Sequence, residues 1–343
     1  MQKGARAIFF LMNQCYLWRF VMNAVLERGS TWPAFYGDKY LFNNRNNWLP
    51  VVSLLIATVL WASSFIALKL AFRSYDPMFV IFGRMAVASA CFLFFLPGFL
   101  KKIDYRSGDI RLIAFMAFCE PCLYFIFEAK AVVNTTASQM GMICATLPLI
   151  VAVVAWIFLK ETISRRMVAG FFLAIVGACW LSISAESSQG APNPALGNFY
   201  EFVAMVCASG YIITCKYLTA RYSPFFLTAL QAFVGSIFFL PLALFPESSL
   251  PTTFEPTAAL AVVYLGVVVS LGAYGCYNYG VSKLPASQAT AFINLIPVFA
   301  IFLGWLILGE KFNFMQYLAA ATVFAGVILS QDSAGRRAAV PES

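Results

Sequence analysis

The sequence predicts an all-α membrane protein with ten transmembrane helices, arranged as two inverted five-helix repeats. Three observations predict this fold: the composition, the number of long apolar stretches and an internal repeat. Of the 343 residues, 61% are hydrophobic and only 11% are charged, whereas about 25% are charged in an ordinary soluble domain. Because so few charges cannot cover a soluble surface, the composition disfavours a soluble enzyme or a nucleic-acid binder, despite the net charge of +8.

The apolar stretches are long enough to be membrane spans, since about 20 residues cross the hydrocarbon core as a helix. Short polar segments separate them, and the longest, residues 186–197, is typical of a linker. We therefore expect a first repeat over 50–185, a second over 198–331 and a cytoplasmic tail over 332–343. The expected helices are 51–71, 78–99, 110–129, 135–159, 166–184, 198–218, 225–245, 257–279, 286–308 and 313–331.

The basic residues of the loops predict the orientation, because cytoplasmic loops carry an excess of Lys and Arg. Ten spans place both ends of the core on one side. The loops on that side and the tail carry twelve Lys and Arg residues, and the opposite loops carry three. We expect both ends of the ten-helix core in the cytoplasm and the protein in the bacterial cytoplasmic (inner) membrane. Most of the positive charge thus reflects topology and indicates no nucleic-acid partner.

The repeat is visible as two sequence shifts. The Ala-Ser-Gln segment at 137–139 recurs at 286–288, a shift of 149 residues, and earlier in each half a shift of 147 maps Arg84 to Gln231. Because each half has an odd number of spans, the second half is inverted in the membrane. Inverted repeats are typical of alternating-access transporters with a site at the midplane between the halves. We favour transport over a duplicated scaffold with another role.

Short motifs occur in a fixed order along the chain, from the first half into the second. They are WASSFIALK at 61–69, Asp-Pro at 76–77 followed by Arg84, and LGEK at 308–311 before a run of small residues. This ordered set resembles the EamA-type carriers of the drug/metabolite transporter superfamily over about 50–331. The resemblance implies ten helices, a central cavity and small organic substrates, often exported, among them amino acids and related metabolites.

Residues 1–49 are an extension, because the resembled family usually starts a few residues before its first helix. The apolar run at 7–25 is interrupted by Arg19, and an arginine at the centre of a membrane helix is costly. We expect a peripheral or disordered extension. An eleventh span, an interfacial helix and an upstream start-codon artefact are the alternatives.

Polar groups inside the spans are the first candidates for function, because they are costly in a bilayer. Glu120, Tyr124 and Glu128 lie four residues apart in the third span and so share one helix face, although Pro121 can bend the helix there. They are expected to bind a cationic or amine group, or Glu120 or Glu128 exchanges a proton. For Glu128 a structural ion pair with Arg84, itself a candidate, is an equal alternative.

Amides and prolines mark the fourth and ninth spans at matching places. Pro148 and Pro297 each permit a bend and free a backbone carbonyl. Gln139, Gln288 and Asn294 could hydrogen-bond a zwitterionic substrate without a charge penalty. Hydrogen bonding between helices is the equal alternative.

Aromatic and small polar residues of the first, sixth and eighth spans complete the candidates. Aromatic residues make up 17% of the chain, so most of them pack against lipid or other helices. The remaining substrate-binding candidates are Trp61, Ser64, Tyr211, Tyr274 and Asn278.

The last span of each half is expected to be scaffold. Glu161 and Glu310 directly precede these spans, where a carboxylate complements a helix N-terminus. Gly177 and Gly326 belong to small-residue faces that suit close helix packing. We expect neither span to line the pathway.

These observations predict a secondary transporter, with export favoured, whose cavity is bounded by spans 1, 3, 4, 6, 8 and 9. There is no histidine and no Walker-type ATP-binding loop, and we expect no enzyme activity, metal or cofactor. The partners are a small-molecule substrate and the lipid bilayer. A monomer and a homodimer are both left open. A membrane-embedded enzyme and a channel are the alternatives from other classes.

Overall fold

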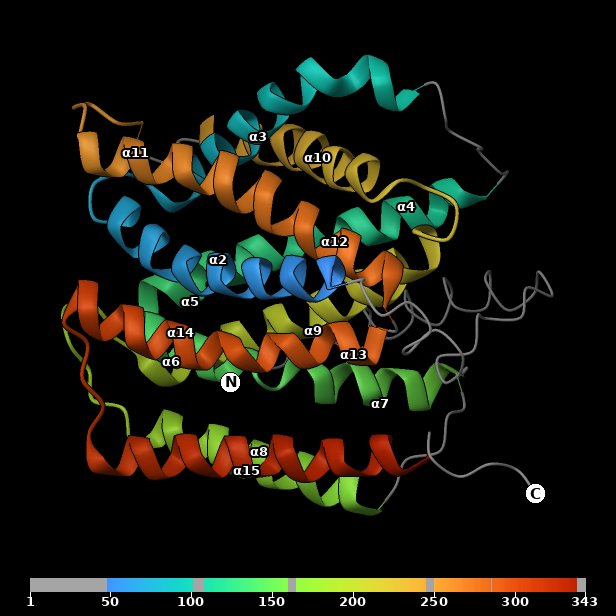
Figure 1. Cartoon of the computed structure of the whole chain (residues 1–343). Coiled ribbons are helices and arrows are strands. Elements are labelled where there is room, and N and C mark those ends of the chain that lie inside the picture. The colour runs from blue at the N-terminus through green and yellow to red at the C-terminus, as the bar shows by residue number, and fades with distance from the viewer. Residues whose placement is uncertain (1–47, 101–107, 160–164, 245–249, 285, 338–343) are drawn as a thin grey trace, which may run out of the picture.

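The computed structural model describes residues 48–100, 108–159, 165–244, 250–284 and 286–337 (Figure 1). In this part of the chain, nine apolar helices have at least 18 residues and can cross a membrane, and a tenth apolar helix covers Phe314–Leu329. The predicted all-α membrane fold is therefore confirmed.

The elements are α2 (Leu49–Phe72), α3 (Pro77–Leu100), α4 (Asp109–Ala117), η1 (Phe118–Leu123), α5 (Tyr124–Asn134), α6 (Ala137–Cys144), α7 (Leu147–Leu159), α8 (Arg165–Ile183), α9 (Pro194–Leu218), α10 (Pro224–Leu244), α11 (Pro256–Tyr264), η2 (Leu265–Ala273), α12 (Tyr274–Lys283), α13 (Ala286–Ala291), η3 (Phe292–Leu295), α14 (Ile296–Leu303), η4 (Gly304–Leu308) and α15 (Phe314–Arg337).

Proline and capping side chains fix where several helices begin. Proline is the first residue of α3, α9, α10 and α11, a position at which its missing N–H costs nothing. Asp76 accepts a hydrogen bond from the backbone N–H of Met78 at 2.8 Å, and Asn193 accepts one from Leu196 at 3.2 Å. These caps stabilise the starts of α3 and α9.

Four spans are interrupted near their middle. The fourth span stops at the end of α6 and restarts as α7 just before Pro148, and the ninth contains the 3₁₀ turn η3 just before Pro297. The predicted interruptions of these two spans at the prolines are therefore present. The eighth span contains the π-helical segment η2. In the third span, η1 is a kink between two helices, because Glu120 has the non-helical angles φ −148° and ψ 118°. Irregular backbone of this kind is frequent at functional sites.

Spans of one half pack against the corresponding spans of the other half. α3 packs against α10, α8 packs against α15, and α6 of the fourth span packs against α14 of the ninth. Ser89 and Ser236, which are related by the shift of 147, share a hydrogen bond of 2.9 Å. A pseudo-twofold axis therefore passes close to this bond.

The last spans of the two halves form a closely packed pair at one edge of the bundle (Figure 1). A β-carbon on Gly177 would lie 2.7 Å from the backbone of Val323, and one on Gly326 would lie 2.5 Å from that of Ala174. These two contacts are equivalent under the shift of 149. The expected close packing of small faces is thus present, and both helices lie away from the centre.

Counterpart helices run in opposite directions across the bundle, as an inverted repeat requires. In Figure 1, α15 and α8 start at opposite ends of the bundle, as do α3 and α10. The start of α2 and the end of α15 lie at the same end. The chain therefore enters and leaves the ten-helix core on one face. Of the predicted extension and tail, residues 1–47 and 338–343 lie outside the described residues, and α15 covers the tail as far as Arg337.

Candidate functional site

A cavity lies at the centre of the bundle between the two halves. Side chains of spans 1, 3, 4, 6, 8 and 9 line it, as the sequence predicted, and Arg84 adds span 2. Eight of the twelve candidate residues are among the lining: Trp61, Ser64, Arg84, Glu120, Tyr124, Glu128, Tyr211 and Tyr274.

Arg84 and Glu128 form a buried ion pair on one side of the cavity. The Arg84 Nη1 and Glu128 Oε2 atoms are 3.4 Å apart, and the side chains are 1% and 3% exposed. This distance exceeds the roughly 2.7–2.9 Å of a close charged hydrogen bond. Arg84 also donates through Nε to Ser270 at 3.0 Å, and Tyr124 donates to Glu128 at 3.2 Å. The ion pair expected as an alternative is therefore present, but it is loose.

Glu120 lies apart from this ion pair. Its carboxylate accepts a hydrogen bond from the Tyr274 hydroxyl, and its backbone carbonyl accepts one from Gln231 Nε2 at 3.2 Å. Neither of the ion pairs within the described residues includes it. It also borders a second, smaller pocket beside Gln231 and Ser270.

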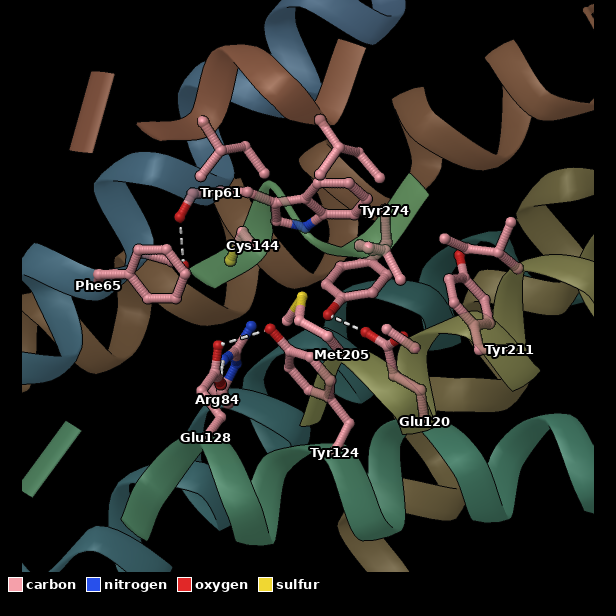
Figure 2. A pocket seen from close by; sticks show the side chains of 16 residues that line it. Trp61, Phe65, Arg84, Glu120, Tyr124, Glu128, Cys144, Met205, Tyr211 and Tyr274 are labelled. Atoms are coloured by element: carbon pink, nitrogen blue, oxygen red, sulfur yellow. Dashed lines mark hydrogen bonds and ion pairs between the residues drawn. The ribbon is translucent and has the colours of Figure 1, made fainter. Parts of the chain in front are cut away.

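The three candidates of the third span face one cavity despite the break at Glu120. Figure 2 shows the Arg84–Glu128 pair on one side of Tyr124 and Glu120 on the other. The break redirects the chain without turning the side chain out of the cavity. The cavity thus presents an arginine at one place and, at another, a carboxyl group that forms no ion pair with the part of the chain that the structure describes.

Three of the other four candidates, Gln139, Asn278 and Asn294, do not line this cavity. Gln139 instead accepts from Asn198 Nδ2 at 2.7 Å, which corresponds to the alternative of bonding between helices. Asn278 lies behind the lining, where it accepts from the Tyr211 hydroxyl and donates to Thr228 at 2.8 Å. Asn294 is not in the lining, and its Oδ1 is buried without a hydrogen-bond partner. The side chain of Gln288 lies outside the described residues.

The structure adds a buried carboxyl group that the sequence analysis missed, Glu201 on α9. It is 0% exposed, and its Oε1 accepts a hydrogen bond from the Cys144 thiol at 3.4 Å. The expected sixth span began at residue 198, which placed Glu201 at the helix edge. The helix instead starts at Pro194 behind the Asn193 cap, so the Asn-Pro pair was the signal that places Glu201 two turns inside.

Glu310 acts on a different helix from the one expected. It does not cap the span that follows it. Its carboxylate accepts from the backbone N–H groups of Ala137 and Ser138, both at 2.9 Å, and from the Ser138 hydroxyl at 2.6 Å. It thus caps α6 in the first half, because the turn after η4 brings it over the start of that helix. Glu161 lies outside the described residues.

A family comparison gives the identity of this fold. The sequence profile of the EamA-like transporter family matches residues 48–183 and again residues 195–331. The chain belongs to the EamA-like transporter family. This membership agrees with the resemblance inferred from the motifs, and it assigns both halves to the same repeated unit.

Relatives of this family member include transporters from bacteria and archaea. An uncharacterized transporter of Bacillus subtilis, YetK, is 27% identical over 81% of this chain and 86% of its own length. A protein of Streptantibioticus cattleyicolor named a probable terminal-alkyne amino-acid exporter is 27% identical over 84% of this chain and 95% of its own length. A crystal structure of another protein, 16% identical, has a TM-score of 0.57 and covers 84% of this chain and 98% of that one, which shows the fold alone.

Proposed function

We propose that this family member is a secondary transporter that exports small organic metabolites, with amino acids and related compounds as the substrate class. The central cavity is the substrate site, and the two halves rock about it to expose it alternately to each side of the membrane. The observation that carries the proposal is the cavity between the halves, in which Arg84 and Glu120 occupy separate places.

The charges of the cavity match the two ends of an amino-acid zwitterion. An arginine has five N–H donors, and the two hydrogen bonds found for Arg84, to Ser270 and Glu128, use two of them. The remaining donors can bind a substrate carboxylate. Glu120, which has no ion-pair partner among the described residues, supplies the negative charge for an ammonium group.

Aromatic rings form the rest of the wall near Glu120. Trp61 and Tyr274 are in edge contact, with ring centroids 5.3 Å apart, and the Tyr211 and Tyr274 centroids are 6.3 Å apart. Aromatic faces attract ammonium groups and pack against apolar side chains. The substrate that fits is therefore a zwitterion or amine with an apolar body.

The export direction and the membrane orientation have separate support. The charge bias of the loops supports cytoplasmic ends, and the name of the S. cattleyicolor relative supports amino-acid export. The Arg84–Glu128 pair supports the release of substrate from the cavity. When the substrate leaves, Arg84 remains paired with Glu128, so no unpaired charge is left buried in the protein.

Counterflow in liposomes tests the proposal. Purified protein is reconstituted, the liposomes are loaded in turn with each unlabelled proteinogenic L-amino acid, and uptake of the same ¹⁴C-labelled compound is followed. We expect saturable counterflow for at least one amino acid, which is lost in Arg84→Gln and retained with a raised KM in Glu120→Gln. Glu255→Gln, which changes an exposed carboxyl group, is the matched control. Ohmic conductance would instead show a channel, and product formation without flux an enzyme.

A further inference from the structure

Glu201 is the buried acidic side chain that the substrate site does not use. It is 0% exposed, and its only hydrogen bond in the described structure comes from the Cys144 thiol to Oε1, at 3.4 Å. Its Oε2 is buried without a hydrogen-bond partner. By contrast, Glu128 accepts from both Arg84 and Tyr124.

Glu201 lies next to the substrate cavity. Met205 and Ala208 follow it by four and seven residues on α9 and line the cavity, so the three share one helix face. Its partner Cys144 is also in the lining, and Figure 2 shows Cys144 and Met205 at the cavity wall. One thiol and one turn of helix therefore separate the carboxyl group from the substrate.

No Lys or Arg of the described residues forms an ion pair with Glu201. The titratable groups that face it are Cys144 on α6 and, on α5, Glu128 and Tyr124, and it belongs to neither ion pair of the described residues. The charge of Arg84 is paired with that of Glu128. An ionised carboxylate with one weak thiol donor and no cation is costly to bury, whereas a protonated carboxyl group is neutral.

A polar cluster connects Glu201 to the face of the bundle where α9 begins. Glu201 follows Pro194 by seven residues, or about 10 Å of helix. One turn before it, Asn198 donates to Gln139 at 2.7 Å and to Ser182 at 3.0 Å and accepts from Thr135 at 2.7 Å. Under the predicted orientation this is the extracytoplasmic face, so the cluster lies between Glu201 and the outside.

From the unpartnered Oε2, the cation-free surroundings and the position beside the cavity, we infer that Glu201 is a proton-binding site that couples substrate export to proton entry. The inference rests on the proposed transport function. Glu201 holds a proton on Oε2 in the arrangement described here. When the cavity opens to the cytoplasm, the O–H bond breaks, the proton passes to water and the carboxylate remains. When the cavity opens outward, the carboxylate takes a proton from water through the side marked by Asn198.

The first test needs no substrate. The infrared carbonyl stretch of a protonated carboxyl group is recorded for the purified full chain at neutral pH in wild type, Glu201→Gln and the control Glu255→Gln. We expect Glu201→Gln to lose a band that the wild type and the control keep. An unchanged band in Glu201→Gln overturns the proposal. Should Glu201→Gln not fold, a Glu120→Gln/Glu128→Gln double variant decides: the band persists if Glu201 carries the proton, and its loss overturns the proposal.

The second test separates coupling from transport. Proteoliposomes are given a pH gradient, and accumulation is measured for the ¹⁴C-labelled amino acid with the largest counterflow. We expect Glu201→Gln to keep counterflow, in which no net proton moves, and to lose the accumulation driven by the gradient, because glutamine can neither release nor take up a proton. Accumulation equal to wild type in Glu201→Gln overturns the inference. Absence of counterflow in the wild type itself contradicts the proposed function, and the infrared result still decides whether Glu201 carries a proton.

Discussion

The two halves of the molecule share their helix packing and differ in the charges they bring to the cavity. The first half supplies Arg84, Glu120 and Glu128, whereas the second half supplies mainly aromatic and aliphatic lining such as Tyr211 and Tyr274. The difference is clearest at counterpart positions. Arg84 is charged and lines the cavity, and its equivalent Gln231 instead donates to the backbone of Glu120.

This comparison separates what the repeat requires from what the site requires. The contacts of Ser89 with Ser236 and of Gly177 with Val323 follow the pseudo-twofold axis, so they belong to the shared scaffold. The charges break the symmetry, so they belong to the site. Changes to the charges should alter transport, and changes on the axis should alter stability alone.

The largest effect on transport and stability is expected from Arg84→Gln, which places in the first half the glutamine that the second half has at the equivalent position, Gln231. It leaves Glu128 buried without its cation, which costs about 3–5 kcal/mol of stability, and it removes the proposed carboxylate contact. We expect a lower unfolding temperature in detergent and no counterflow.

The double variant Arg84→Gln/Glu128→Gln is the control for this loss. It removes both charges, so it should recover most of the stability while counterflow stays absent. Wild-type counterflow in either variant would show that the asymmetric charge has no part in transport.

A somewhat smaller effect is expected from Glu120→Gln. Glutamine can still accept from the Tyr274 hydroxyl, so only the negative charge is lost. A hydrogen bond to a charged group contributes about 1.5–3 kcal/mol, which corresponds to a rise in the KM for an amino acid of about tenfold or more. Concentration-dependent counterflow measures it, and an unchanged KM would remove Glu120 from the ammonium site.

On the scaffold side, Gly177→Ala should destabilise the protein without changing the KM. The added β-carbon would meet the Val323 backbone at 2.7 Å, and such overpacking costs about 1–3 kcal/mol. The matched control is Gly190→Ala, because a β-carbon there meets nothing within 4 Å. Thermal unfolding measures the difference, and a changed KM in Gly177→Ala would show that α8 and α15 influence the site.

The smallest effect is expected at the axis itself. Ser89→Ala removes the hydroxyl that pairs with Ser236, and polar pairs between membrane helices average about 0.6 kcal/mol. A cycle with Ser236→Ala should give a coupling of that size and leave counterflow intact. A coupling energy well above that average would mean that the Ser89–Ser236 hydrogen bond holds the two halves together more strongly than an ordinary polar pair between membrane helices.

Hydropathy and the repeat were sufficient to predict the span positions, because long apolar stretches leave few alternatives in a bilayer. Helical spacing was sufficient to group Glu120, Tyr124 and Glu128, because all three face the cavity. The sequence could not distinguish Gln139, which bonds other helices, from a lining residue. Nor could it show that Glu310 caps a helix of the other half, because both contacts depend on which spans become neighbours.

The exchange of Arg84 for Gln231 has a consequence for how a ligand lies in the cavity. A site with true twofold symmetry offers every ligand two equivalent poses, related by a half-turn. Because the guanidinium of Arg84 lies on one side only, these two poses differ in energy. The cavity therefore distinguishes the carboxylate end of a substrate from its other end. A zwitterion bound there would therefore take one orientation, although the spans around it come from a repeated unit.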